Sequence, residues 1–537
     1  MRSLSGIFNP LMERKRSMRC LSSCGLALLS FFLPAAIHVN GAQPGEDPFS
    51  IRWHFEKSSD WLHPAAWPGK TQLDTGGNAR SGKSCLALES TANEDNVEGR
   101  VFLRISQYRI GTVPGRRFLI RVFVKGSGDF RLGIVQTRQK NGRRITGRIT
   151  GQRHSATSNY AEYSYRIDLT DSPDTVLIQP LIVLESQGRI LIDDAEIREV
   201  PPDDFKLAAE TPHLIIPRDQ QEIAIRFNSE KKNREISLYQ FIDGECVSSR
   251  KSPSGEIVFP VQNIPAESCM VRAAALGNTV DVWISRISDA QYRKLDGLAS
   301  RVRMRKPLHV LFLGDSISDF LRGHNYIDKL AFWLNRRNPG MFSFRNAAVH
   351  GDFITRTLQR LKGMTGKPKA FKQYRYDGLW NEKYDLVYIW LGHNDTVSNT
   401  TWDKTLKKPR ISPELQKKAY TQVIDEIRKH TRARIILVSA ASLNEPVCIR
   451  QMRSMKRPDG LKYLFGRPEL LEEWNRNLRQ IAMERKVNCL DLYDALKNHP
   501  EKDSLFSQED GVHPVEKGHD FLAGLFLRDF AEKGWGQ

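Results

Sequence analysis

Polar stretches in the second half of the chain contain residue types that can act together in nucleophilic chemistry. Ser316 ends the run LHVLFLGDS, and Asn394 stands in GHND. Asp510 precedes His513 by three residues in DGVHP. A serine hydroxyl is a weak nucleophile near neutral pH, and histidine has the unperturbed pKa that suits the adjacent base it needs. The Asp510–His513 spacing allows one turn to direct the carboxylate to the imidazole Nδ1 and leave Nε2 for Ser316.

Acyl transfer to a serine also requires hydrogen-bond donors for the oxyanion of the tetrahedral intermediate. The candidates are the backbone N–H groups of Ser316 and Gly351 and the side-chain amide of Asn394. Glycine suits position 351 because it has no Cβ to block the approach of a substrate. We therefore predict Ser316, Asp510 and His513 as catalytic residues. Ser316, Gly351 and Asn394 are predicted to form the oxyanion hole.

Each of these residues also has a purely structural explanation. Ser316 and Asp510 could cap the helices that follow them, and Asn394 could be a turn residue. Their joint occurrence in one region favours the catalytic interpretation. Other histidines nearby lack an aspartate three residues earlier and are expected to line the site or lie at the surface: His350, His393 and His519.

The region that must position these residues alternates between strand-like runs and amphipathic helical stretches, which predicts a parallel sheet with helices on both faces. Strands are expected at 308–313, 384–391, 433–439 and 487–491. Helices are expected around 323–336, 353–363, 413–430, 468–486 and 515–532. Ligands of such sheets bind beyond the carboxyl ends of the strands, where the polar stretches fall.

The ordered set GDS, NAAVHG, GHND and DGVHP resembles the SGNH, or GDSL-type, serine hydrolases, whose blocks carry Ser, Gly, Asn and His in this order. The resemblance covers residues 308–537. It implies a three-layer, flavodoxin-like α/β fold, ester hydrolysis without a metal or organic cofactor, and the catalytic roles given above. The segment ISDFLRG after Ser316 departs from the usual continuation of the first block, so that match rests on GDS.

Two long insertions, 396–412 and 441–466, follow expected strands at the same edge. The first carries Trp402 and several lysines, and the second is rich in Met, Lys and Arg. We expect them either to form walls of a substrate pocket or to be solvated loops.

Residues 42–200 contain short strand-like runs with little helical periodicity, which favours an antiparallel β-sandwich. The phrases ARSGKSCLALES, VPGRRFLIRVFVKGSG and GRILIDDAEIREV resemble the jelly-roll carbohydrate-binding modules with a galactose-binding-like fold. Aromatic residues of this segment could stack on sugar rings or belong to the core: Trp53, Trp61, Trp67 and Tyr108.

Residues 201–290 begin with the rigid polar segment PPDD and continue with alternating runs such as EIAIRF and TVDVWISRI. This pattern predicts an immunoglobulin-like β-sandwich that acts as a spacer. Residues 291–307 are expected to form a linker with a short helix into the hydrolase domain at 308–537.

The first 41 residues have the pattern of a secretory signal peptide: basic residues at 14–19, the apolar stretch GLALLSFFLPAAI, then small residues. A membrane anchor is the competing interpretation, but an apolar stretch of about 13 residues falls short of the roughly 20 that span a bilayer. We expect a secreted, periplasmic or cell-envelope protein without integral membrane association after cleavage.

The net charge is +19, and about +15 without the leader. This excess favours anionic surroundings such as acidic polysaccharide or cell envelope, or simply a solvated basic surface. No nucleic-acid partner is expected, because the basic residues are scattered and no binding module occurs.

The cysteines beyond the leader form no CxxC pair, so a zinc or redox motif has no support: Cys85, Cys246, Cys269, Cys448 and Cys489. A Cys246–Cys269 disulfide is one possibility in an oxidising compartment.

Together these patterns predict a serine esterase that removes O-acyl groups, most simply O-acetyl groups, from polysaccharide through an acyl-enzyme. A lipase, lysophospholipase or thioesterase of the same fold is the enzymatic alternative. A non-catalytic carbohydrate-binding envelope protein is the alternative from another class.

Overall fold

The computed structural model describes residues 278–363, 372–456 and 460–537 of the C-terminal part of the chain. In the N-terminal part it describes 37–38, 50–55, 70–92, 101–104, 110–111, 116–140, 143–169, 174–200, 207–209, 211–229, 236–242, 245–252, 256–260, 264 and 267–275. The predicted signal peptide lies almost wholly outside the described residues, as do Trp61, Trp67 and Tyr108. No helix among the described residues is long and apolar enough to cross a membrane.

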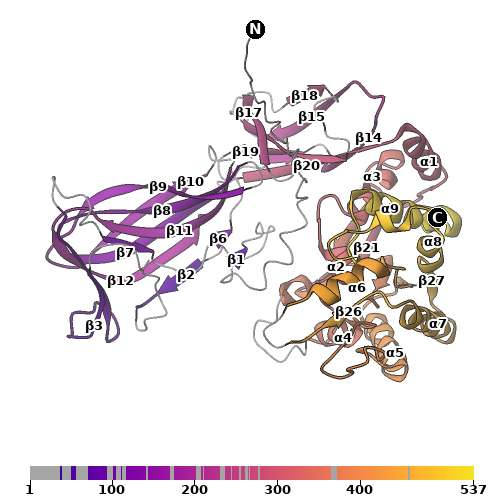
Figure 1. The fold of residues 1–537 in the computed structure, drawn as a ribbon. Coiled ribbons are helices and arrows are strands. Elements are labelled where there is room, and N and C mark those ends of the chain that lie inside the picture. The colour runs from indigo at the N-terminus through magenta and orange to yellow at the C-terminus, as the bar shows by residue number, and fades with distance from the viewer. Residues whose placement is uncertain are drawn as a thin grey trace, which may run out of the picture.

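A five-stranded parallel sheet forms the centre of the C-terminal part (Figure 1). In spatial order its strands are β22 (Phe342–Asn346), β21 (Leu308–Gly314), β23 (Leu386–Trp390), β25 (Arg434–Val438) and β27 (Asn488–Leu490). The central strand β23 is buried at every position, as its run of apolar residues requires when both faces of a sheet are covered. The prediction of a parallel α/β sheet is confirmed.

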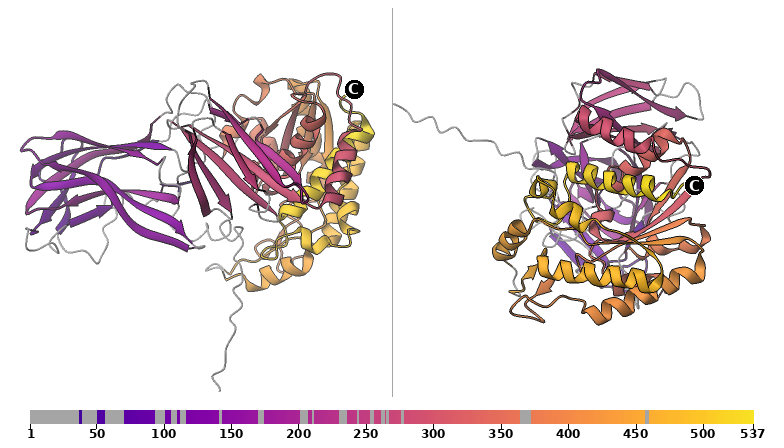
Figure 2. Two further views of the ribbon diagram at one scale, coloured as in Figure 1. Left: turned by 90° about the horizontal axis from the view of Figure 1, so that it is seen from above. Right: turned by 90° about the vertical axis from the view of Figure 1, so that its right-hand side faces the viewer.

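Helices cover both faces of this sheet (Figure 2). One group consists of α1 (Asp289–Ala299), α3 (Tyr326–Arg337) and α9 (Glu516–Lys533), which contact one another. A second group consists of α4 (Ile354–Leu361), α5 (Pro413–His430) and α7 (Pro468–Arg485), in which α5 contacts both of the others. Local sequence sets several of these starts: Asn325 and Asp328 form a capping box on α3, and Ser412 caps α5 just before Pro413. The result is three layers.

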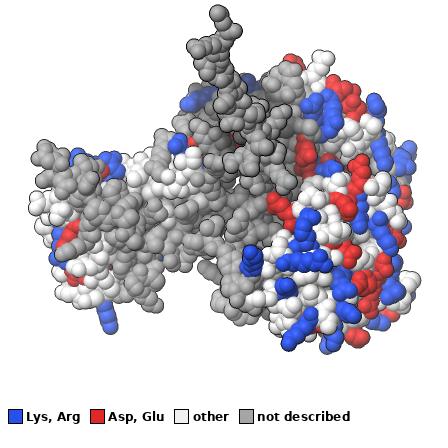
Figure 3. All heavy atoms as spheres, viewed as in Figure 1, with Lys and Arg blue, Asp and Glu red and all other residues white. Residues whose placement is uncertain are grey.

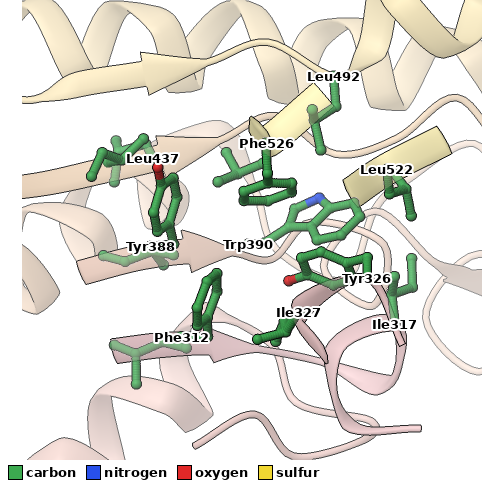
Figure 4. Close-up of a cluster of buried hydrophobic side chains, with 14 of the residues drawn as sticks. Phe312, Ile317, Tyr326, Ile327, Tyr388, Trp390, Leu437, Leu492, Leu522 and Phe526 are labelled. Carbon is green, nitrogen blue, oxygen red and sulfur yellow. The ribbon is translucent and has the colours of Figure 1, made fainter. Parts of the chain in front are cut away.

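Large aromatic residues fill the core between the sheet and the group around α9 (Figure 4). Phe312 of β21 stacks on Tyr388 of β23 with ring centroids 5.3 Å apart. Phe526 of α9 lies 5.2 Å from Tyr388 and 4.9 Å from Tyr326 of α3. This packing sets the distance between the sheet and these helices. It therefore also positions the sheet edge from which the polar residues project.

The two insertions contact each other. Strand β24 (Ser398–Asn399) of the first pairs antiparallel with β26 (Tyr463–Leu464) of the second. The second also contains a helix, α6 (Glu445–Ser454), which Asn444 caps by accepting from the Val447 backbone N–H. Of the two alternatives, simple solvated loops are wrong for the second insertion, because EPVCIRQMRS forms a helix with its proline in the first turn. The described residues also form the short helices α2 (Ser316–Asp319), α8 (Tyr493–Lys497), η6 (Gln373–Tyr376), η7 (Leu379–Asn381) and η8 (Lys502–Leu505).

The N-terminal part is rich in strands, which form two six-stranded sheets over one apolar core. One sheet contains β1 (Ile37–His38), β5 (Val101–Arg104), β6 (Ile110–Gly111), β8 (Asp129–Lys140), β9 (Arg143–Ser155) and β11 (Thr175–Leu184). The other contains β2 (Ser50–Trp53), β3 (Lys70–Asp74), β4 (Cys85–Ser90), β7 (Arg117–Ser127), β10 (Ala161–Asp168) and β12 (Gly188–Glu199). Trp53 is buried in the shared core, so it is a packing residue rather than a sugar-stacking one.

Two smaller sheets lie between these strands and the α/β part (Figure 2). One has β13 (Leu207–Ala209), β15 (Glu222–Ser229) and β18 (Glu256–Pro260). The other has β14 (His213–Pro217), β16 (Ile236–Ile242), β17 (Glu245–Ser252), β19 (Ser268–Ala275) and β20 (Asn278–Ile287). Cys246 and Cys269 are both free, so the disulfide considered above is wrong. Cys269 belongs to one apolar cluster, whereas Cys246 packs with Phe241 in another, on the opposite face of the same sheet.

The five-stranded sheet that contains β20 packs on the α/β part. Trp283 of β20 stacks on His324 with ring centroids 3.9 Å apart. The buried Lys329 ammonium of α3 donates to Ser285 Oγ (3.0 Å), Glu516 Oε1 (2.6 Å) and Asp520 Oδ1 (2.6 Å). Ile215 and Ile287 also join the core of the α/β part.

Candidate active site

Ser316 begins the short helix α2 directly after strand β21. Asp315, not Ser316, is the N-cap residue: its Oδ1 accepts from the Ile317 backbone N–H at 3.0 Å. The helix-cap explanation of Ser316 is therefore wrong, and its hydroxyl is available for other contacts. The strand places this hydroxyl at the carboxyl edge of the sheet.

A chain of hydrogen bonds joins Ser316, His513 and Asp510. Ser316 Oγ lies 2.8 Å from His513 Nε2, and Asp510 Oδ2 lies 2.7 Å from His513 Nδ1. Burial acts to raise the pKa of Asp510, but the hydrogen bond and charge of His513 outweigh it and hold that pKa below its ordinary value. Asp510 therefore stays ionised and fixes a ring whose Nε2 faces the serine hydroxyl.

The loop that carries His513 is held by its own backbone. The Ser507 N–H donates to the His513 carbonyl and the Gly511 N–H to the Ser507 carbonyl, both at 2.8 Å. Gly511 has φ +72°, and a Cβ there would lie 2.6 Å from the Asn444 carbonyl oxygen. The Asn444 N–H in turn donates to the Gly511 carbonyl at 3.0 Å. The start of α6, in the second insertion, thus supports the histidine loop, and Asp510 does not cap α9, whose N-cap is Val515.

Gly351 follows β22 along a path that stays beside β21. The Val349 N–H donates to the Gly314 carbonyl at 3.0 Å, which brings this path next to the residues that precede Ser316. Gly351 has φ +77°, a conformation that favours glycine, and open space surrounds the position of a Cβ. Within the described part of the chain, neither its N–H nor that of Ser316 has a hydrogen-bond acceptor.

Asn394 lies close to Gly351. Its Nδ2 donates to the carbonyl of Asp352, the residue after Gly351, at 3.1 Å, and Asn394 as a whole is 9% exposed. The structure therefore brings all five predicted residues to one edge of the sheet through contacts between β21, β22, β23 and the histidine loop. Two N–H groups without acceptors and one amide at this edge are suitable donors for a substrate oxyanion.

The neighbouring histidines have structural roles. His393 is buried, with Nδ1 3.3 Å from Asp315 Oδ2 and Nε2 accepting from the Ala441 N–H at 2.8 Å. His519 is also buried, and burial lowers its pKa to about 3. The expectation that these two line the site or lie at the surface is wrong, because both support backbone inside the domain. His350 is half-exposed and lies beside the site.

Asp395 follows Asn394 and is fully buried. Its Oδ1 accepts from the Ile354 N–H at 2.8 Å, whereas its Oδ2 has no hydrogen-bond partner among the described residues. Burial, and then the charge of Asp315, raise the pKa of Asp395 to about 7. This carboxyl therefore titrates directly beneath the predicted oxyanion hole.

Asp319 was not singled out by the sequence reasoning. Its Oδ2 accepts from both the backbone N–H and Nδ1 of His350 at 2.9 Å, so it ties the residue before Gly351 to helix α2. Arg322, Lys372 and Arg375 form ion pairs with the same carboxylate. Burial acts to raise the pKa of Asp319, but these partners hold it well below its ordinary value. Its position one helical turn after Ser316 was the available signal.

The arrangement is suited to acyl transfer to a serine. His513 Nε2 can accept the Ser316 proton, and the donors at the sheet edge can stabilise an oxyanion. No cluster of His, Cys, Asp and Glu with metal-site geometry occurs in the described ranges.

A match to one protein family covers the part of the chain that carries this geometry. Residues 312–521 match the profile of the GDSL-like Lipase/Acylhydrolase family. A lipase/acylhydrolase from Enterococcus faecalis is 19% identical over 42% of this chain and 96% of its own, with a TM-score of 0.30. A GDSL-like lipase from Bacteroides thetaiotaomicron is 14% identical over 45% of this chain and 98% of its own, with a TM-score of 0.27. A protein from Bacillus subtilis is 12% identical over 90% of this chain and 99% of its own, with a TM-score of 0.28. No curated protein matches the chain.

Residues 312–521 thus form a GDSL/SGNH lipase/acylhydrolase domain. Membership of this family supports a carboxylic ester hydrolase.

Proposed function

We propose that the protein is an exported serine esterase that removes O-acyl groups, chiefly O-acetyl groups, from polysaccharide. The observation that carries the catalytic part of this proposal is the Ser316–His513–Asp510 chain, with donor–acceptor distances of 2.8 and 2.7 Å. In this proposal residues 42–200 are the carbohydrate-binding module, 201–290 the spacer and 308–537 the catalytic domain.

The reaction has two steps. His513 Nε2 takes the Ser316 proton as Oγ attacks the acyl carbon, and the N–H groups of Ser316 and Gly351 with the Asn394 amide receive the oxyanion. His513 then gives its proton to the sugar oxygen, which leaves, and an acyl-Ser316 ester remains. Water attacks this ester with His513 again as base, and the carboxylic acid is released.

The polysaccharide part of the proposal is supported by the two strand-rich segments that precede the catalytic domain. A sugar-binding module on the same chain as the catalytic domain raises the effective concentration of polymer ester near the catalytic site. The charge distribution agrees with a polar substrate: in the view of Figure 3, Lys and Arg side chains lie among acidic ones over the C-terminal part.

The test is release of acetate from acetylated polysaccharides by the purified protein and by Ser316→Ala. We expect release by the wild type and none above background by the variant. Equal release by the variant would remove Ser316 from the mechanism.

Chain-length profiling with p-nitrophenyl esters separates the esterase from a lipase or thioesterase. Acetate is expected to be the preferred acyl group, and preference for octanoate would favour the alternative. Labelling of Ser316 by a fluorophosphonate probe separates both enzymes from an inert binding protein.

A further inference from the structure

Two arginines lie against one phenylalanine beside the predicted oxyanion hole. The Arg356 guanidinium is 4.6 Å from the centroid of the Phe353 ring, and that of Arg410 is 4.8 Å from the same centroid. Arg356 comes from α4, whereas Arg410 comes from the end of the first insertion. Two like charges gathered on one ring repel each other, so their closeness needs an explanation.

No carboxylate neutralises this pair fully. The side chain of Arg410 is half-buried and makes no hydrogen bond or ion pair with any residue in the described part of the chain. Arg356 approaches Asp352 Oδ1 only to 3.9 Å. That carboxylate already accepts two hydrogen bonds from Arg360, at 2.6 and 3.0 Å.

The remaining acid near Arg410 is Asp395, and it offers little compensation near neutral pH. Burial raises the pKa of Asp395 to about 7, so a large fraction of it is uncharged there. Burial, and also the charge of Arg356, lower the pKa of Arg410, but a guanidinium stays charged in proteins. The pair therefore presents excess positive charge.

The pair is placed directly at the site. Phe353 lies two residues after Gly351, and Arg356 Nη1 is 3.5 Å from the Gly351 carbonyl oxygen. The residue after Arg410, Ile411, donates its N–H to the Asp395 carbonyl at 3.0 Å. One arginine is thus tied to the Gly351 side of the oxyanion hole and the other to the Asn394 side.

An exposed aromatic ring adjoins the pair. Trp402 of the first insertion is 42% exposed, and its ring centroid is 5.9 Å from the Arg410 guanidinium. Its Nε1 donates to the Lys408 carbonyl at 3.4 Å, which orients the ring. Exposed indole rings stack on the apolar faces of sugars, and guanidinium groups bind carboxylate or sulfate oxygens through paired hydrogen bonds.

We propose that Arg356, Arg410 and Trp402 form a subsite for an anionic sugar unit, one that carries a carboxylate or sulfate group, next to the ester that Ser316 attacks. The inference rests on the proposed function and sharpens it: the substrate is an acylated acidic polysaccharide. The arginines bind the anion, Trp402 supports the ring, and the first insertion supplies two of the three groups.

The test compares kcat/KM for two acetylated polymers, an acidic polygalacturonate and a neutral mannan. We expect the wild type to prefer the acidic polymer by about tenfold or more, chiefly through KM, because each charge-assisted contact is worth roughly a factor of ten. In Arg356→Gln/Arg410→Gln the ratio should fall to near one. Arg410→Lys, which keeps the charge but loses the planar fork, should give an intermediate ratio.

Arg301→Gln/Arg303→Gln is the matched control, because both arginines are exposed just after α1 and their loss changes the net charge by the same two units as the double variant. Its ratio should equal that of the wild type. Inhibition of p-nitrophenyl acetate hydrolysis by oligogalacturonate and by a sulfated oligosaccharide then shows which anion binds better. Inhibition by either one, weakened in the Arg356→Gln/Arg410→Gln variant, supports the subsite.

A wild-type enzyme that cleaves both polymers equally well would overturn the subsite while leaving the esterase intact. A ratio lowered as much by Arg301→Gln/Arg303→Gln as by the Arg356→Gln/Arg410→Gln variant would also overturn it, since the effect would then be one of net charge. Loss of the proposed function itself has a different signature: acetate release that does not depend on Ser316.

Discussion

A buried aspartate in the N-terminal sheets and one at the catalytic edge differ in their hydrogen-bond partners. Asp193 of β12 is fully buried and fully used: its Oδ2 accepts from the Arg80 and Ser81 N–H groups at 2.9 Å, and its Oδ1 from the Asp194 N–H at 2.8 Å. Asp395 is equally buried, yet one of its oxygens has no partner among the described residues. Burial raises the pKa of both.

The difference shows how the surroundings of a buried carboxylate differ between a structural position and the catalytic edge. The Asp193 carboxylate holds the segment between β3 and β4, and both of its oxygens already accept hydrogen bonds from the protein. Around Asp395 the N–H groups of Ser316 and Gly351 lack acceptors, and the Arg410 side chain has no ion-pair or hydrogen-bond partner, within the described ranges. Side-chain atoms without partners also occur in the N-terminal sheets, such as Thr71 Oγ1 and His154 Nε2. Only at the catalytic edge, among the residues that the structure describes, do we find free donors next to a candidate nucleophile, which favours a binding site there.

The largest expected effect tests whether that edge carries the chemistry. Ser316→Ala should lower kcat for p-nitrophenyl acetate by about 10⁴ to 10⁶, because the nucleophile is lost. Steady-state kinetics measures this directly. Ser454→Ala, which removes an exposed hydroxyl on α6, is the control and should keep full activity.

The oxyanion donors should give the next largest effect. Asn394→Ala should lower kcat by about 10² to 10³ with a much smaller change in KM, because the amide acts on charge that develops in the transition state. A rise in KM at constant kcat would instead indicate a role in ground-state binding.

Asp319 is expected to act through Gly351 rather than on the substrate. Asp319→Ala should lower kcat by about 10 to 10² while KM changes little, because the loop that holds Gly351 loses its tie to α2. Asp319→Asn keeps an acceptor for the His350 N–H and should recover part of kcat. Equal kcat in the two variants would argue against this positioning role.

Removal of the satisfied carboxylate should affect stability alone. Asp193→Ala leaves the Arg80, Ser81 and Asp194 N–H groups without their acceptor and should lower the free energy of unfolding of the N-terminal sheets by about 1 to 3 kcal/mol. Thermal denaturation measures the change. A loss of kcat on p-nitrophenyl acetate would show that the two regions are not independent.

The smallest effect concerns pH. The folded-state pKa of Asp395 lies above its unfolded value, so the folded state holds a proton that the unfolded state has lost, and stability falls as pH rises through about 7. Between pH 6 and 8 the wild type should lose about 1 kcal/mol relative to Asp395→Asn, which cannot titrate. Urea unfolding at both values measures the difference, and parallel curves would show that Asp395 does not titrate there.

Sequence patterns predicted much of the α/β fold because its signals are local. The expected strands 308–313, 384–391 and 433–439 each lie within two residues of β21, β23 and β25. The expected helix 413–430 coincides with α5, which Ser412 and Pro413 start. A short run of apolar residues is enough to predict a buried parallel strand, and a cap residue followed by proline is enough to predict the start of a helix.

The features that the sequence did not predict depend on contacts between distant segments. Pairing of β24 with β26 joins residues more than sixty positions apart, and no local pattern specifies it. The roles of Asp319, Arg356 and Arg410 depend on contacts with loops that are distant in the sequence. The helix α6 is a different case. The proline in its first turn is a local helix signal, although the segment was predicted to be a loop.

The lysine buried between α3, α9 and β20 shows that the segment matching the family and the packed structural unit have different boundaries. The segment that matches the family starts at residue 312, yet Lys329 donates to the Ser285 hydroxyl of strand β20, and the apolar core extends back through α1 to Ile215. The packed core therefore extends beyond the segment that matches the family. A shortened chain that begins at residue 308 would expose the apolar faces of α3 and α9 to water, and its instability would reflect a cut core rather than a damaged active site.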